Sequence, residues 1–88
     1  MRHLAKALID ALAFLELSND DVVAPDGAAA TFESIAATLQ SSSDEEREAL
    51  AAAAMAELNV QSAADAPEEV LDFYEHVLVD LGLEEPAE

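Results

Sequence analysis

The side chains of this sequence that are best suited to chemistry are its carboxylates and its two histidines. His76 has Asp72 four residues before it and Asp80 four residues after it. On a helix this spacing puts all three side chains on one face, where they would offer nitrogen and oxygen ligands to a divalent metal. The simpler interpretation is a solvated histidine whose charged form the neighbouring carboxylates favour. We therefore predict no metal site at His76.

A second set of possible ligands lies in the first third of the chain. Asp26, Gly27 and Glu33 have the spacing of positions 5, 6 and 12 of a calcium-binding EF-hand loop. In that register, positions 1 and 3 are Val22 and Ala24, which have no carboxylate. The pattern therefore indicates a turn that enters a helix, and no calcium site is predicted.

The sequence carries no recognisable catalytic motif. It has no cysteine, which excludes disulfides, zinc–thiolate sites and thiol catalysis. It also has no glycine-rich phosphate loop and no serine–histidine–acid spacing. Carboxylate pairs such as Asp72 and Glu75 are frequent, but 20 acidic residues in 88 produce such pairs by chance. A thin core leaves little room for the buried pocket that catalytic carboxylates need, so we expect no enzymatic activity and no cofactor.

Charge is the strongest signal in the composition. The 20 acidic residues stand against 3 basic ones, which gives a formal net charge of −17 at pH 7. This charge disfavours direct contact with nucleic-acid phosphates or anionic membranes and favours a basic partner. Apolar residues nevertheless make up 52% of the chain, which is too high a share for a disordered acidic tail. We expect a small folded domain that recognises something basic.

The N-terminal segment superficially resembles a signal peptide, because Arg2 and Lys6 precede an apolar run. Asp10 and Glu16 interrupt that run, whereas the apolar region of a secretory signal carries no such charges. No uncharged apolar stretch approaches the roughly 18–20 residues that span a bilayer. The sequence therefore predicts a soluble, cytoplasmic protein.

Four segments of the chain have helical periodicity, and no strand pattern competes with them. We expect helices over residues 3–17, about 28–39, from a cap at 43 to about 58, and from about 65–67 to 81. Short turn-rich connections between amphipathic helices are typical of a compact antiparallel four-helix bundle. We therefore predict an all-α fold, with one four-helix domain over residues 1–83 and an acidic C-terminal tail over residues 84–88.

Apolar residues spaced by three and four positions predict the buried face of each helix. The predicted core residues, in chain order, are Leu4, Leu8, Ala11, Leu12 and Leu15 with Phe14 beside them; Ala28, Phe32, Ile35, Ala36 and Leu39; Leu50, Ala51, Ala54, Met55 and Leu58; and Val70, Phe73, Tyr74, Val77 and Leu81, widened by Leu71 and Leu78. This core is thin, because many of the apolar residues of the chain are alanine.

Local signals mark where the helices begin and end. Ser43 and Glu46 have the spacing of a capping box. Asn59 is a plausible stop for that helix, and Pro67 suits the first turn of the next. Gly82 fits a left-handed cap at the end of the last helix, with the following leucine folding back onto it.

The outward face of the last helix is the most informative surface of the sequence. Its residues are Glu68, Glu69, Asp72, Glu75, His76, Val79 and Asp80. Acidic side chains at these spacings repel one another and slightly destabilise a helix. A solvated face that keeps the protein soluble is the alternative interpretation. The net charge of the whole chain favours a recognition surface for a basic partner protein, with Val79 as a small apolar anchor at its centre.

Two other acidic clusters are alternative binding surfaces. One comprises Asp44, Glu45 and Glu48 at the start of the third helix. The other comprises Asp20, Asp21 and Asp26 in the first connection. The sequence does not choose among the three clusters.

A small, cysteine-free, strongly acidic helical bundle resembles the bacterial immunity proteins that neutralise toxins, and it is similar in charge to small antitoxins and nucleic-acid mimics. The resemblance covers the whole chain in size, charge and helicity, without a shared motif, so it assigns no functional residue. It implies an inhibitor that occludes a basic active-site or substrate-binding surface of a toxin or effector. The alternatives are a DNA-mimic inhibitor of a nucleic-acid-binding protein and a structural helical module that forms a homodimer.

Overall fold

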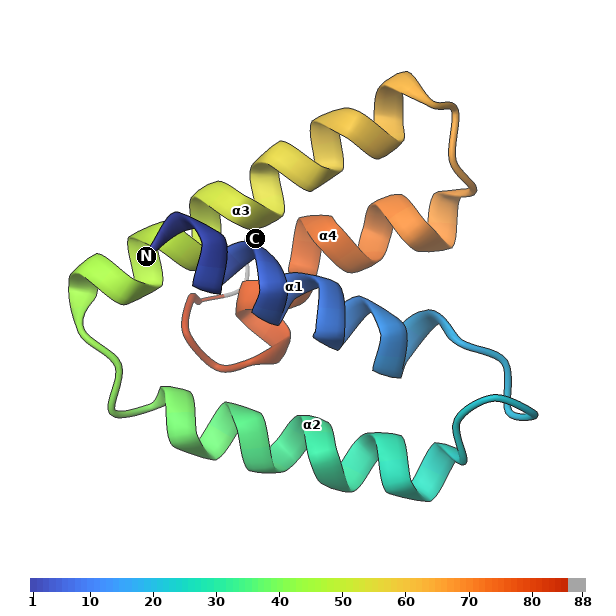
Figure 1. Cartoon of the computed structure of the whole chain (residues 1–88), viewed down its shortest axis with the longest axis horizontal. Helices are drawn as coiled ribbons and strands as arrows, with labels where there is room; N and C mark the ends of the chain where they lie inside the picture. The colour runs from blue at the N-terminus through green and yellow to red at the C-terminus, as the bar shows by residue number, and fades with distance from the viewer. Residues whose placement is uncertain (86–88) are drawn as a thin grey trace.

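The computed structural model describes residues 1–85 and contains four α-helices (Figure 1). They are α1 (Arg2–Leu17), α2 (Pro25–Leu39), α3 (Asp44–Ala63) and α4 (Glu68–Asp80). Consecutive helices run in opposite directions, and there is no strand among the described residues. The predicted all-α antiparallel four-helix bundle is therefore confirmed. Of the predicted acidic tail, Pro86 to Glu88 lie outside the described residues.

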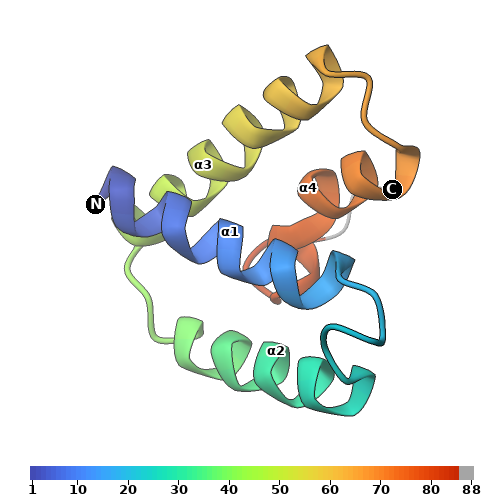
Figure 2. The same cartoon turned by 45° about the vertical axis from the view of Figure 1, so that its right-hand side comes forward.

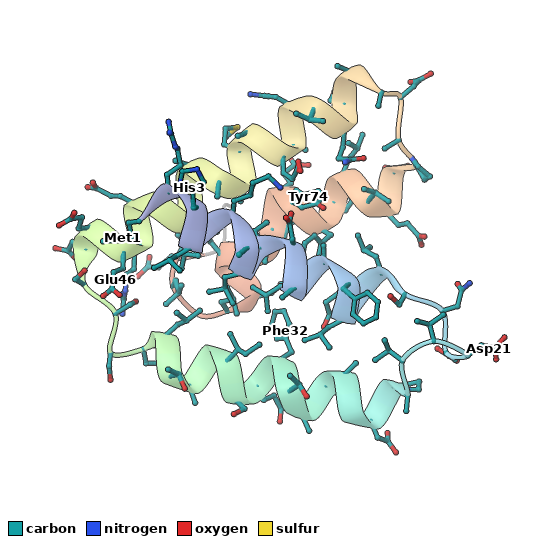
Figure 3. The ribbon with its side chains drawn as sticks, viewed as in Figure 1. Met1, His3, Asp21, Phe32, Glu46 and Tyr74 are labelled. Carbon is teal, nitrogen blue, oxygen red and sulfur yellow. The ribbon has the colours of Figure 1, made fainter. Side chains whose placement is uncertain are left out.

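α1 is the central helix of the bundle. It packs against each of the other three helices, and α3 and α4 also pack against each other. The rotated view shows α1 between α2 on one side and the α3–α4 pair on the other (Figure 2). The backbone of α2 approaches only that of α1, and Phe32 points from α2 toward α1 (Figure 3). The predicted inner residues of α2 are consequently only partly buried, except for Ala28.

The core lies where α1, α3 and α4 meet. Its largest fully buried side chains are Ile9, Leu12, Val77 and Leu81. Phe73 and Tyr74 also belong to it, and their rings form an edge-to-face pair with centroids 5.0 Å apart. Alanines of α1 and α3 complete the core, and small side chains at such contacts allow two helix axes to approach closely.

The buried face of α1 is rotated from the predicted one. The structure buries Ala5, Ile9, Leu12 and Ala13, of which only Leu12 belongs to the predicted set. Leu4 is 75% exposed and Phe14 is 55% exposed, so the prediction for these two residues is wrong. The physical reason is that α1 is apolar around most of its circumference, and the packing of α3 and α4 decides which side is buried. Ala11 also faces solvent.

The ends of α2 and α3 differ from the prediction as well. α2 begins at Pro25, three residues earlier than expected, because proline at the first helical position has its φ preset and loses no hydrogen bond there. α3 continues through Asn59 to Ala63, since one residue of modest helix propensity does not end a helix that packs on two neighbours. α3 ends at Ala63 with Ala64 as its C-cap, and Asp65 beyond the cap has a left-handed φ of 60°. Met55, predicted to be buried, is 57% exposed on this helix.

The predicted caps are present where local chemistry specifies them. The Ser43 hydroxyl accepts a hydrogen bond of 3.1 Å from the Glu46 backbone N–H, and the Glu46 carboxylate accepts one of 2.9 Å from the Ser43 N–H. Gly82 is left-handed with φ 76°, and the Leu83 N–H donates to the Leu78 carbonyl at 2.9 Å. Pro67 stands one position before α4, as its N-cap.

Replacing Ser43 with alanine is expected to destabilise the protein by about 1 kcal/mol, because an N–H at the start of α3 loses its acceptor. The Ser43 backbone N–H, which donates to the Glu46 carboxylate, and the Ser43 side chain also hold the pKa of that carboxyl below its usual range. Their contribution is therefore present at neutral pH and is lost as the pH falls through that lowered pKa. Thermal melts compare the melting temperature of Ser43→Ala with that of the control Ser41→Ala. Ser41 is an exposed serine outside the helices. Equal melting temperatures would contradict the capping role.

Tyr74 gives a second pH-dependent expectation. Burial raises the pKa of its hydroxyl, and Glu57 and Asp10 raise it further. Because the folded-state pKa is raised, the neutral Tyr74 hydroxyl favours the folded state. Its contribution to stability is complete below the ordinary tyrosine pKa of about 10 and is lost as the pH rises through the folded-state value. Tyr74 is the only tyrosine and there is no tryptophan, so tyrosinate absorbance reports this residue alone. We expect ionisation to coincide with alkaline loss of helicity, and Tyr74→Phe to retain helicity to higher pH.

Candidate functional site

α4 turns the predicted recognition residues away from the core. Its inner side buries Phe73, Tyr74, Val77 and Leu78, which fixes the rotation of the helix about its axis. The opposite side carries Glu68, Glu69, Asp72, Glu75, His76, Val79 and Asp80, which we call the α4 acidic face. All of these residues are exposed except Val79, which is partly buried. The structure thus brings the whole predicted set together on one surface.

The carboxylates of the α4 acidic face have no cationic partner among the described residues. Both ion pairs of the described chain are made by Lys6, whose Nζ lies 2.8 Å from Asp10 Oδ2 and 3.9 Å from Glu57 Oε1. The Arg47 guanidinium donates instead to the Gln40 carbonyl at 2.9 Å and to the Ser42 hydroxyl at 3.1 Å. The negative charge of α4 is therefore available to an external partner.

Asp72, Glu75 and His76 form the tightest cluster on this face. One ligand atom from each lies within 4.8 Å of the others, and all three side chains are exposed. His76 Nδ1–H donates a hydrogen bond of 2.9 Å to the Asp72 carbonyl. Asp80, the other carboxylate that the sequence grouped with His76, does not belong to this cluster. The three residues are close because they share one turn of a helix, and that proximity alone does not indicate a bound metal.

The α4 acidic face continues into the connection between α1 and α2. A hollow there has an acidic and polar lining, made by Glu16, Leu17, Ser18, Asn19, Asp20, Asp21 and Glu69. Asp20 and Asp21, which the sequence offered as part of a separate cluster, therefore lie beside Glu69 at the start of α4. Sequence reasoning missed this juxtaposition, although the predicted antiparallel order places the end of one helix near the start of another.

The third acidic cluster occupies a different part of the molecule. Asp44, Glu45 and Glu48 are exposed on the first turns of α3. Figure 3 shows Glu46, on the first turn of α3, at the left of the molecule and Asp21 at the right. Asp21 lies beside Glu69 at the start of α4, so the starts of α3 and α4 are at opposite sides. The α3 cluster is thus a separate surface and provides a matched control for the α4 acidic face.

A mainly apolar groove, unlike the acidic surfaces, runs between α1 and α3. It has a volume of about 580 Å³, and its lining residues are Arg2, Lys6, Ala49, Ala52, Ala53, Ala56, Glu57 and Val60. Sequence reasoning missed it, because it exists only where the alanines of α3 lie against the start of α1. The basic residues of the lining are Arg2 and Lys6, and Lys6 is already engaged by Asp10 and Glu57.

None of the described helices is both long enough and apolar enough to cross a membrane. Searches against protein-family models, curated proteins and solved structures find no match to this chain. The functional interpretation therefore depends on the residues and the geometry of the chain itself.

Proposed function

We propose that this protein is an acidic inhibitor that binds a basic protein and covers its active-site or substrate-binding surface. The proposed activity is toxin neutralisation, because the chain resembles bacterial immunity proteins in size, charge and helicity and is similar in charge to small antitoxins. The proposal rests on one observation above all: the α4 acidic face is exposed, extends to Asp20 and Asp21, and has no cationic partner among the described residues. The proposed setting is the cytoplasm of a bacterium.

Electrostatic attraction supplies the first step of the proposed mechanism. A net charge of −17 steers the protein onto a positively charged patch and raises the association rate, by about 10–1000-fold at low salt. Positive patches commonly line sites that handle phosphates or nucleotides, so an acidic inhibitor reaches such sites preferentially. The carboxylates then accept charge-assisted hydrogen bonds from arginine and lysine side chains of the partner.

Packing of α4 supplies the second step. Four buried residues hold α4 against α1 and α3, so its outward face is already ordered before binding. A preorganised surface loses less conformational entropy on association than a mobile one. Val79, partly buried among the carboxylates, offers an apolar contact that excludes water from the centre of the interface.

The proposal is tested by capture of the partner on the 88-residue chain. Extract of the native organism is passed over three immobilised proteins: wild type, Asp72→Lys/Glu75→Lys on α4, and the matched control Glu45→Lys/Glu48→Lys on α3. We expect a basic protein to bind wild type and the α3 control and to elute from both with salt. The same protein should be absent from the α4 variant column, and the wild-type chain should inhibit its activity. An identical set of proteins on all three columns would contradict the proposal. A captured nucleic-acid-binding protein that DNA displaces would favour the DNA-mimic alternative.

A further inference from the structure

α1 has a second apolar stripe on the side that faces away from the core. It consists of Leu4, Ala7, Ala11 and Phe14, which are spaced by three and four residues and therefore share one helix face. All four are exposed, with 75% of Leu4 and 55% of Phe14 accessible to solvent. Large apolar side chains gathered on an exposed helix face mark a contact with another molecule more often than isolated ones do.

The charges around this stripe suit a second copy of the same chain. Lys6 and Asp10 flank the stripe and balance each other in an ion pair of 2.8 Å. Arg2 and Glu16 lie elsewhere on α1, in the groove against α3 and in the acidic hollow beside Glu69. The rest of the protein carries the excess negative charge, so two copies repel each other in most orientations. The stripe is the surface at which two copies repel each other least, because the charges that flank it cancel. A basic partner is attracted to the acidic surfaces instead.

We propose that the protein forms a homodimer through antiparallel packing of two α1 helices along this stripe. The four positions are symmetric about residue 9. A twofold axis at that level therefore sets Leu4 of each copy opposite Phe14 of the other, and Ala7 opposite Ala11. The alanines at the centre allow the helix axes to approach to about 8–10 Å. The larger side chains then fill the space at the two ends.

The polar edge of the stripe favours the antiparallel arrangement over the parallel one. Lys6 and Asp10 form an ion pair of 2.8 Å along this edge. In antiparallel packing Lys6 of one copy lies on the same flank as Asp10 of the other and near its level, so opposite charges meet. Asp10 of one copy also lies near Asp10 of the other, but two Lys6–Asp10 attractions between the copies outweigh that single repulsion. Parallel packing would set the two Lys6–Asp10 edges on opposite flanks, where they do not meet. The α4 acidic face lies on another helix and stays exposed, so the dimer does not depend on the proposed function.

Sedimentation equilibrium tests the dimer over chain concentrations from micromolar to millimolar at physiological salt. We expect a concentration-dependent rise from 9.3 kDa to twice that mass. Leu4→Ser/Phe14→Ser should weaken self-association about tenfold or more, since it removes both apolar anchors. The matched control is Met55→Ser/Val60→Ser on α3, residues that are 57% and 58% exposed, and it should dimerise like wild type. Circular dichroism verifies that both variants keep their helicity.

Cysteine cross-linking tests the register, because the chain has no cysteine of its own. Chains with Ala7→Cys are mixed with chains with Ala11→Cys under mild oxidation. We expect the mixed disulfide to form faster than either homodisulfide. A protein that stays monomeric at millimolar concentration, or a dimer that Leu4→Ser/Phe14→Ser leaves unchanged, would overturn the proposal. Preferential homodisulfides would overturn its antiparallel arrangement.

Discussion

Replacing Phe73 with alanine is expected to unfold much of the protein at 37 °C. Phe73 is 8% exposed, belongs to the core and packs edge-on against Tyr74. Truncating such a side chain costs about 3–5 kcal/mol, because it leaves a cavity as well as losing apolar contact. A domain of 88 residues has a total stability of only about 5–10 kcal/mol, so this one substitution removes a large fraction of it.

The matched control for Phe73 is Phe14, the same residue type with 55% of its surface exposed. Circular-dichroism melts at micromolar chain concentration should show a large drop in melting temperature for Phe73→Ala and a small one for Phe14→Ala. Equal shifts for the two variants would contradict the placement of α4 and the rotation of α1.

Reversing charge at Asp72 and Glu75 is expected to slow partner association by about tenfold or more at low salt, because it removes part of the electrostatic steering. The fold should survive, because both residues are exposed on the side of α4 opposite its buried residues, and the change relieves repulsion between like charges. The control Glu45→Lys/Glu48→Lys changes the net charge by the same amount, so the difference between the two variants reports position rather than total charge. Stopped-flow or surface-based kinetics on the captured partner measures both rates.

The features that could be predicted from the sequence are those that short-range chemistry specifies. Ser43 and Glu46 are three residues apart, and their capping box needs only these two side chains and the backbone between them. Gly82 adopts a left-handed φ that few other residues accept, so it marks the end of α4 wherever that helix packs. The inner face of α4 was predicted correctly because acidic residues fill its other side and leave only one apolar stripe.

Features that depend on contacts between distant segments were not predictable in this way. α1 has apolar residues on two sides, and its own periodicity does not distinguish Ile9, which is buried, from Leu4, which is exposed. The continuation of α3 past Asn59 likewise depends on packing rather than on propensity. The proximity of Asp20 and Asp21 to Glu69 arises only when the end of α1 meets the start of α4.

The association rate measured against ionic strength tests the role of the α4 acidic face most directly. It is recorded with the captured partner for wild type, Asp72→Lys/Glu75→Lys and Glu45→Lys/Glu48→Lys. We expect wild type and the α3 control to associate rapidly at low salt and to slow steeply as salt screens the charges. The α4 variant should associate more slowly at low salt and depend less steeply on salt than the α3 control. Equal rates and equal salt dependence for all three proteins would contradict the account and exclude the α4 acidic face from the binding site.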